Sequence, residues 1–304
     1  MDSATLAALQ TESRNGKTTN IDTVSTLEFC QIMNDEDAQI ASAVKACLPQ
    51  IAEAIDVIVP RIVKGGRVVY IGAGTSLGPP TFSVDPTQFV GLIAGGERAL
   101  RSAIEGAEDS ESKGGEALAA LSPPFCSDDV LIGIASSGRT PYVLGSLKHA
   151  QALGAATVGL ACVNPSAMRG LCGVLIECVT GPEVVTGSTR LKAGTATKMI
   201  LNMISTGAQV RSGKTFGNLM VDLSIRNEKL QLRARRVFRE LVASSISVDA
   251  TKDEELDALI SSCDGSVKLA ILVAILGCGV DEARGKLERH SGVLRQVLQA
   301  EGLA

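Results

Sequence analysis

Three short segments of the sequence are rich in glycine, serine and threonine and could bind an anion. They are GAGTS at 72–76, SSGRT at 136–140 and TGSTRLKAGTA at 186–196. Glycine lets the backbone approach an anion closely, and hydroxyls and the free N–H groups of a following helix donate hydrogen bonds to it. Each loop alone could equally be an ordinary strand-to-helix turn. Three of them together suit a ligand that carries a phosphate and several hydroxyls.

Charged residues stand in or near two of these loops. Glu108 lies in the segment AIEGAEDSE beside Gly106 and Ala107, whose small size would let a carboxylate pack close to other backbone. A glutamate near a phosphosugar-binding loop could act as a general acid or base. Arg190 and Lys192 are the cations of the third loop and could neutralise a phosphate or an enolate-like intermediate. The alternative for both sets is an exposed helix end whose charges are simply hydrated.

The elements that would position these loops follow from five apolar runs of strand length. The runs lie at 67–72, 89–94, 129–135, 156–163 and 174–179. They are almost continuously apolar, and helical segments such as 97–107 and 141–153 separate them, which is typical of a parallel sheet covered on both faces. Such sheets bind ligands beyond the carboxyl ends of their strands. The loops after the first, third and fifth runs are therefore the predicted ligand site.

Helical spacing flanks the predicted sheet on both sides. A helix is expected over 40–63, another over 191–215 and a long charged one over 221–243. The last residues differ in composition and are expected to form three short helices. We therefore predict three parts, which are an N-terminal arm with helices at 1–64, an α/β domain at 65–243 and a small C-terminal helical subdomain at 244–304.

The composition limits the class of protein. The chain has 304 residues, a net charge of −4 and a pI near 5.4, so no general electrostatic attraction draws it to nucleic acid or to an anionic membrane. Its longest apolar stretch, at 269–280, is too short to span a bilayer, and the N-terminus lacks the apolar core of a signal peptide. Eight cysteines and two histidines show no metal-binding spacing. We expect mostly buried, reduced thiols, no metal and a cytoplasmic location.

Further segments, spread in order over the whole chain, form a recognisable pattern with these loops. They are TESRN at 11–15, IDTVSTLE at 21–28, MNDEDA at 33–38, YIGAGTS at 70–76, PPTF at 79–82, GLIAGGE at 91–97, EGAEDS at 105–110, GIASSGRTPYV at 133–143, GPEVVTGSTRLKAGTATK at 181–198, LNMISTG at 201–207 and NLMVD at 218–222. Together they resemble the N-acetylmuramic acid 6-phosphate etherases. These enzymes belong to the sugar isomerase (SIS) superfamily, as does the glucokinase regulatory protein.

The resemblance implies a parallel-sheet SIS domain that binds a phosphosugar. It also implies an enzyme that cleaves the D-lactyl ether of N-acetylmuramic acid 6-phosphate to N-acetylglucosamine 6-phosphate and D-lactate, without metal or organic cofactor. In the family the sugar opens to its aldehyde, a base removes the C2 proton, lactate leaves C3 and water adds. Glu108 matches one of two catalytic glutamates and would be the base at C2 or toward water. The implied substrate-binding residues are Thr75, Ser76, Ser136, Ser137, Thr140, Ser188, Thr189 and Lys192.

The resemblance breaks after the first loop. The family continues from GAGTS through a segment like GRLGxLDASEC into PPTF, whereas this chain passes from Ser76 through Leu77 and Gly78 directly to Pro79. About nine residues are absent, which at 3.6 residues per turn is about two and a half helical turns. The absent segment includes the family's second catalytic glutamate, its proton donor. Asp85, the nearest carboxylate downstream, has no counterpart role in the family.

Three hypotheses for function follow. The chain is an etherase, or it is a non-catalytic phosphosugar-binding regulator of the glucokinase regulatory protein type, or an in-frame segment has been lost from the sequence, as in an alternative transcript. A sugar isomerase is a weaker fourth reading, because the long motif at 181–198 favours the etherases. The family and the apolar, Ala- and Met-rich helix at 196–210 also predict a homodimer. The expected ligand is a phosphorylated amino sugar, with neither nucleic acid nor membrane as a partner.

Overall fold

The fold was analysed on a computed structural model, which describes residues 11, 13–72, 85, 87–100, 102, 104–187, 189–223, 225, 227–242 and 252–303. The chain divides into two compact units, of which the first extends to Ser205 and the second begins at Thr206. The predicted boundary after residue 243 differs from this division. The reason is that helix α8 (Glu228–Val242) buries Phe238 in one core with side chains of the C-terminal helices. The N-terminal helices belong to the same unit as the sheet.

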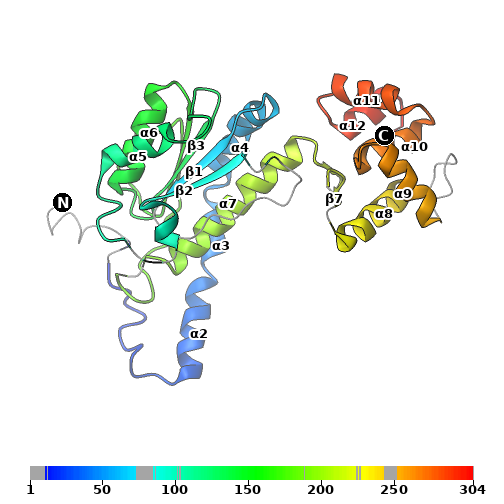
Figure 1. Cartoon of the computed structure of the whole chain (residues 1–304). Coiled ribbons are helices and arrows are strands. Elements are labelled where there is room, and N and C mark those ends of the chain that lie inside the picture. Colours follow the sequence, from blue (N-terminus) through cyan, green and yellow to red (C-terminus); the bar gives the residue numbers. More distant parts are fainter. Residues whose placement is uncertain are drawn as a thin grey trace. The chain divides into compact units, whose positions relative to one another are not determined.

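A five-stranded parallel sheet forms the centre of the first unit (Figure 1). Its strands are β1 (Val68–Gly72), β2 (Phe89–Ile93), β3 (Val130–Ile134), β4 (Ala156–Ala161) and β5 (Val174–Glu177). They are ordered β2-β1-β3-β4-β5, and every neighbouring pair is parallel. The predicted α/β fold with a parallel sheet is therefore confirmed, and each strand ends within two residues of its expected bounds.

Helices lie on both sides of this sheet, which explains why its strands are apolar along their whole length. Figure 1 shows α5 (Glu111–Ala119) and α6 (Pro141–Ala152) on one side and α4 (Leu48–Val63) and α7 (Lys192–Arg211) on the other. The α5 and α6 side buries one core in which alternate strand residues meet helix residues. This core includes Val69, Ile71, Leu131, Leu118, Val143 and Leu147.

Helices α5 and α6 approach each other so closely that glycine is required where they cross. A Cβ on Gly145 would lie 1.9 Å from the carbonyl oxygen of Glu111, and one on Gly114 would lie 2.1 Å from that of Tyr142. Real Cβ atoms do not approach a backbone oxygen so closely, because the packed interior has no space to yield. These two glycines therefore fix the distance between the helices and, with it, the position of the start of α6.

The N-terminal helices are α2 (Thr26–Asp37), α3 (Ile40–Lys45) and α4. The single helix expected over 40–63 is wrong, because the chain breaks between α3 and α4. Pro49 has no N–H to donate to the carbonyl of Lys45, so an uninterrupted helix would lose that hydrogen bond. At the start of α2, the side chain of Ser25 accepts a hydrogen bond of 3.3 Å from the backbone N–H of Glu28.

The segment after β2 is less helical than expected. The structure has a short 3-10 helix η1 (Gly96–Leu100), and the residues from 104 to 109 form turns instead of continuing the helix predicted over 97–107. Gly95, Gly96 and Gly106 have φ values of +86°, +66° and +70°. This left-handed conformation suits glycine and is incompatible with a continuous right-handed helix.

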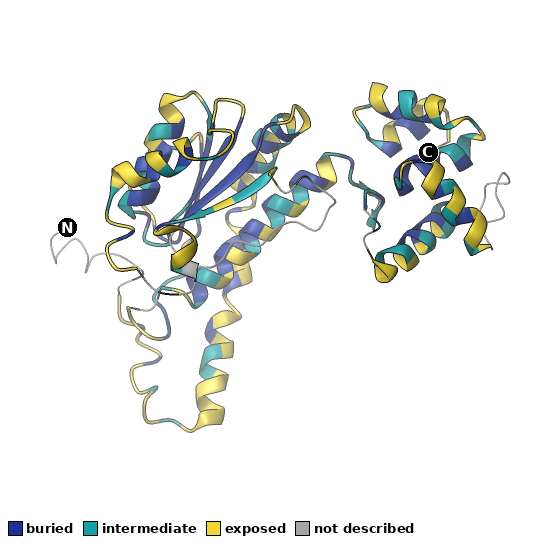
Figure 2. Cartoon of the chain, viewed as in Figure 1, coloured by how far each residue is buried: buried dark blue, intermediate teal, exposed yellow. Residues whose placement is uncertain are grey.

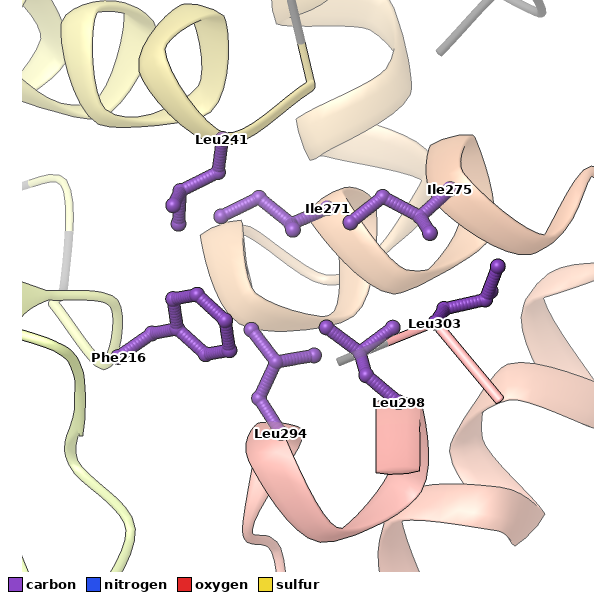
Figure 3. Close-up of a pocket in the computed structure, with 7 residues that line it drawn as sticks. All are labelled: Phe216, Leu241, Ile271, Ile275, Leu294, Leu298 and Leu303. Atoms are coloured by element: carbon purple, nitrogen blue, oxygen red, sulfur yellow. The ribbon is translucent and has the colours of Figure 1, made fainter. Parts of the chain in front are cut away.

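The second unit is a helical bundle with a small hairpin. After the end of α7 come β6 (Thr215–Phe216), β7 (Leu219–Met220), α8, α9 (Asp253–Ser262), α10 (Val267–Leu276), α11 (Val280–Arg289) and α12 (Leu294–Ala300). The helix expected over 221–243 begins only at Glu228. The described C-terminal residues form four helices where three were predicted. Figure 3 shows apolar side chains that converge on a cavity of this unit, among them Phe216, Ile271 and Leu298.

No single helix in the described part of the chain is long and apolar enough to cross a membrane. Helices α9 and α10 reach that length and composition only as a pair bent by 105°.

Candidate functional site

The strand order places the first and third strands side by side at the point where the chain changes direction across the sheet. From β1 the chain moves outward to β2, and from β3 it moves the other way to β4 and β5. In sheets with this order, ligands bind in the crevice beyond the carboxyl ends of the two strands at the reversal. The loop after β1 includes Thr75 and Ser76, which lie outside the described residues. The loop after β3 contains Ser136, Ser137 and Thr140.

The loop at 136–140 is held in shape by its glycine and by hydrogen bonds. Gly138 has φ of +68°, and a Cβ there would lie 2.5 Å from the Cβ of Ser166, so only glycine fits. The backbone N–H of Arg139 donates to Oγ of Ser137 at 3.4 Å. Ser136, Ser137 and Thr140 are all partly exposed at the start of α6. The loop therefore presents hydroxyls in a fixed conformation.

At the start of α6, the groups that can donate a hydrogen bond to a ligand are hydroxyls, because the backbone N–H groups of the first turn already have partners within the protein. Pro141 has no N–H, and the N–H groups of Val143 and Leu144 donate to the carbonyl of Thr140. Thr140 occupies the N-cap position, yet its side chain makes no capping hydrogen bond within the described residues. Nε of Arg139 is buried and also has no hydrogen-bond partner there. Arg139 was not predicted as a site residue from the sequence, in which it is a single charged residue within a run of hydroxyls.

Glu108 is attached to this same helix start through its backbone. Its carbonyl oxygen accepts a hydrogen bond of 3.0 Å from the N–H of Tyr142, in the first turn of α6. The preceding Ala107 is buried, whereas Glu108 itself is exposed. The structure thus brings the backbone of Glu108 beside the loop that holds Ser136, Ser137 and Thr140, and leaves its side chain accessible to solvent.

The third predicted loop ends in a buried charge pair. Lys192 is 3% exposed, and its ammonium donates to Oε2 of Glu36 at 2.7 Å. The backbone N–H groups of Lys192 and Ala193 donate to the two carboxylate oxygens of Glu183 at 2.8 and 3.1 Å, so this buried glutamate caps α7. Thr189 is partly exposed. Ser188 lies outside the described residues.

Glu36 accepts hydrogen bonds from four side chains, one of which is Gln39, whose Nε2 donates to Oε1 at 3.3 Å. Besides Lys192, Nδ2 of Asn15 donates to Oε2 at 2.9 Å and the ammonium of Lys17 lies 3.2 Å from Oε1. Burial opposes ionisation of Glu36, but the hydrogen bonds from Lys192, Asn15 and Lys17 outweigh it and hold its pKa at about 2. Sequence reasoning missed this residue, because 156 positions separate Glu36 from Lys192 and no spacing rule links them.

A groove lies beside this network, between the end of α2, helix α3 and the segment after β5. Its volume is about 580 Å³, and we call it the Thr180 groove. It is lined by Glu36, Ala38, Gln39, Ile40, Ser42, Ala43, Val179, Thr180 and Gly181. Oγ1 of Thr180 is buried without a hydrogen-bond partner among the described residues. All of these residues belong to the first unit.

The cysteines, histidines and acidic residues form no metal-binding cluster in the part of the chain that the structure describes. There, no group of three or more histidine, cysteine, aspartate or glutamate side chains could hold a metal ion. All eight cysteines are free. Cys47, Cys162, Cys178 and Cys263 are buried as expected, whereas Cys30 and Cys126 are exposed.

Comparison with known proteins gives matches over nearly the whole chain. An N-acetylmuramic acid 6-phosphate etherase of Clostridium beijerinckii is 48% identical over 98% of this chain and 98% of its own length. The etherase of Mycolicibacterium smegmatis is 44% identical over 97% of this chain and 99% of its own length. A family model described as the glucokinase regulatory protein N-terminal SIS domain matches residues 80–151.

Solved structures of sugar-phosphate isomerases match about three fifths of the chain more distantly. A putative phosphosugar isomerase of Bacteroides fragilis, involved in capsule formation, is 20% identical with a TM-score of 0.47, over 62% of this chain and 92% of its own. A phosphoheptose isomerase of Francisella tularensis is 18% identical with a TM-score of 0.46, over 61% of this chain and 100% of its own.

Proposed function

This chain belongs to the N-acetylmuramic acid 6-phosphate etherase family, and we propose that it cleaves the D-lactyl ether of N-acetylmuramic acid 6-phosphate to N-acetylglucosamine 6-phosphate and D-lactate. The observation that carries this proposal is an identity of 44–48% to etherases over 97–98% of the chain. The identity extends across both units, whereas the regulatory-protein model covers residues 80–151 only. The etherase reading therefore accounts for more of the sequence than the regulator reading.

We assign the base of the reaction to Glu108. Its carboxylate is exposed while its backbone is held at the first turn of α6, so it can contact a ligand bound over the loop at 136–140. Removal of the C2 proton of the open-chain aldehyde leaves an enolate, from which lactate departs at C3. Water then adds at C3, and C2 takes a proton back. The same carboxyl group, once its proton has exchanged with solvent, can deliver a solvent-derived proton to C2.

We assign the sugar phosphate to the hydroxyls at the carboxyl ends of the strands. The hydroxyl of Ser137 accepts from the N–H of Arg139, Thr140 makes no capping hydrogen bond within the described residues, and Arg139 adds a positive charge in the loop that also carries Ser136. Thr75, Ser76, Ser188 and Thr189 are assigned to the substrate from the family pattern. Lys192 is assigned a positioning role, because its ammonium is engaged by Glu36 at 2.7 Å.

The absent segment after Ser76 has a kinetic consequence. Lactate is a poor leaving group unless it is protonated, and the proton donor of the family lies in that segment. Loss of a positioned general acid costs roughly 10²–10⁴-fold in rate. We therefore propose an etherase that turns over slowly, in which water supplies the proton for lactate. We further propose that the protein is cytoplasmic and acts as a homodimer.

The test is D-lactate release from N-acetylmuramic acid 6-phosphate, followed with D-lactate dehydrogenase. Glu108→Gln should lower kcat by at least 100-fold with little change in KM. Glu105→Gln is the matched control, because Glu105 is exposed in the same turn and should leave kcat within twofold. Tight binding of the substrate with no release by the wild type would instead support the regulator reading.

A further inference from the structure

Arg139 places a positive charge in the loop at 136–140 for which the chain itself supplies no anion. Its side chain makes no ion pair within the described residues, and its Nε is buried there without a hydrogen-bond acceptor. A buried donor without an acceptor destabilises a protein, and a guanidinium cannot lose its charge to avoid this. The side chain of Arg139 is therefore suited to an anionic acceptor that comes from outside the chain.

The backbone that carries Arg139 is held in one conformation. Figure 2 shows that β3, which leads into the loop, is buried along nearly all of its length. Beyond the strand, the N–H of Gly138 donates to the carbonyl of Ala135 at 2.8 Å, and the N–H of Ala167 donates to the carbonyl of Gly138 at 3.0 Å. A fixed backbone limits the space that the guanidinium can sample, so less freedom is lost when a ligand binds it.

Other cations at this edge of the sheet are already paired or hydrated. Lys192 and Arg169 each pair with a glutamate, at 2.7 and 2.6 Å. Arg190, in the loop before α7, is exposed, so its charge is hydrated. Arg139 differs from all three, because it is partly buried and its charge is not compensated within the described residues.

The substrate of the proposed function carries two anions, and Arg139 fits the second of them. N-acetylmuramic acid 6-phosphate has a phosphate on C6, which is assigned to the hydroxyls of the loop, and a carboxylate on the lactyl group at C3. A carboxylate is planar and matches the guanidinium fork with two parallel hydrogen bonds. The lactyl group stands next to C2, the carbon from which Glu108 takes the proton. The backbone of Glu108 is bonded to Tyr142, in the helical turn that follows Arg139.

We propose that the guanidinium of Arg139 binds the carboxylate of the D-lactyl group and so selects the muramyl sugar over its product. This inference rests on the proposed function and deepens it. N-acetylglucosamine 6-phosphate keeps the phosphate and lacks the carboxylate. Arg139 therefore recognises the one group that distinguishes the ether from a plain amino sugar phosphate.

The same contact assists the departure of lactate. As the C3–O bond breaks, its electron pair goes to the lactate oxygen, which takes a proton from water. A guanidinium on the adjacent carboxylate stabilises the negative charge that develops on that oxygen. This stabilisation has particular weight in a chain without the proton donor of the family.

The first test compares two ligands by isothermal titration calorimetry. All samples carry Glu108→Gln, so that the substrate is not consumed, and D-lactate is measured at the end to verify this. Arg139→Gln should weaken the binding of N-acetylmuramic acid 6-phosphate by about 10- to 100-fold and that of N-acetylglucosamine 6-phosphate by less than about threefold. Retained binding of the second ligand also shows that the variant is folded.

Arg169→Gln is the matched control for this test. It removes the same charge from the same edge of the sheet, where Glu177 already pairs with it, and should change neither affinity by more than about twofold. Equal weakening of both ligands by Arg139→Gln would place Arg139 on the phosphate and overturn the proposal. Unchanged binding of both ligands would also overturn it.

A second test changes the ligand and does not depend on a disruptive variant. The carboxamide of N-acetylmuramic acid 6-phosphate keeps the size of the lactyl group and loses its charge. With Arg139 present, the amide should bind about 10- to 100-fold more weakly than the acid, and in Arg139→Gln the two should bind alike. This double-mutant cycle isolates the contact. No preference for the acid with Arg139 present, or a preference that persists in Arg139→Gln, overturns the proposal.

D-lactate release by the chain with its natural Glu108 separates this inference from the proposed activity. Arg139→Gln should lower kcat by about tenfold or more as well as raising KM, and an unchanged kcat would refute the assistance to lactate departure. If the natural chain prefers the acid to the amide but releases no lactate, the carboxylate contact stands and the activity is refuted. If it releases lactate and binds acid and amide alike, the activity stands and the carboxylate contact is refuted.

Discussion

The change of Glu36 to Gln is expected to destabilise the first unit strongly, although it removes only a charge. Glutamine has the same shape and keeps an oxygen that can accept hydrogen bonds from Lys192 and Asn15. The ammonium of Lys192 stays buried, however, at 3% exposure for the residue, and loses the anion that compensates it. A buried charge left without its partner typically costs about 3–5 kcal/mol.

The pKa of Glu36 gives an independent magnitude. Its carboxyl has a pKa of about 2 in the folded protein, against an ordinary value of 4.5. At about 1.4 kcal/mol for each pKa unit, that difference stabilises the folded state by about 3 kcal/mol. Because the folded pKa is depressed, this contribution is complete above pH 4.5 and is lost as the pH falls toward 2. At pH 3 about 1 kcal/mol of it remains.

The assay is urea unfolding followed by tyrosine fluorescence. The chain has two tyrosines and no tryptophan, and both Tyr70 and Tyr142 are buried in the first unit, so the signal reports that unit alone. Wild type and Glu36→Gln should differ by about 3 kcal/mol at pH 7 and by about 1 kcal/mol at pH 3. Glu111→Gln is the matched control, since the Glu111–Lys148 pair is about half exposed on both sides, and it should cost less than about 1 kcal/mol.

Two results would refute this reasoning. A difference at pH 7 no larger than that of the control would show that Glu36 does not compensate a buried lysine. A difference of about 3 kcal/mol that stays constant down to pH 3 would show that the effect comes from packing and not from the ionised carboxylate.

Three further changes test the fold. Asp129→Asn should lower the free energy of unfolding by about 3–5 kcal/mol in the urea assay, because Asp129 is 2% exposed and accepts three hydrogen bonds from Arg67. A decrease of less than about 1 kcal/mol would contradict this. Gly145→Ala should lower the free energy of unfolding by about 1–3 kcal/mol or more, because the new Cβ forces α5 and α6 apart. Gly194→Ala is the control, since no atom lies within 4 Å of its new Cβ, and it should leave the free energy of unfolding unchanged or raise it. Ser266→Ala removes the side-chain cap of α10. Amide hydrogen exchange in that helix should become faster, by an amount that corresponds to a loss of about 1 kcal/mol in the free energy of opening. Unchanged exchange would contradict a stabilising cap.

The sheet could be predicted from the sequence because each strand is buried on both faces. A strand covered by helices on both sides is apolar at every position, which makes runs such as 129–135 visible without an alignment. The helices were less well predicted, because their limits depend on single residues that override periodicity. Pro49 divides the expected helix at 40–63, and glycines with positive φ, such as Gly106, convert the expected helix at 97–107 into turns.

The candidate site was predictable where its residues are neighbours in sequence and not where they meet only in space. The hydroxyl loop at 136–140 follows its strand directly, so composition alone identified it. The contact of Glu108 with α6 and that of Lys192 with Glu36 join distant segments, and no spacing rule can anticipate them. Lys192 shows the consequence, since its charge suggested a ligand contact while the structure pairs it with a buried carboxylate.

The most direct test of the central claim is the reaction of N-acetylmuramic acid 6-phosphate in deuterium oxide. Elimination and rehydration replace the hydrogen at C2 with one from solvent. We therefore expect D-lactate together with N-acetylglucosamine 6-phosphate that carries one deuterium at C2, seen by mass spectrometry and NMR, from the wild type but not from Glu108→Gln. Absence of D-lactate release, or a product that retains its original hydrogen at C2, would contradict an etherase with Glu108 as its base.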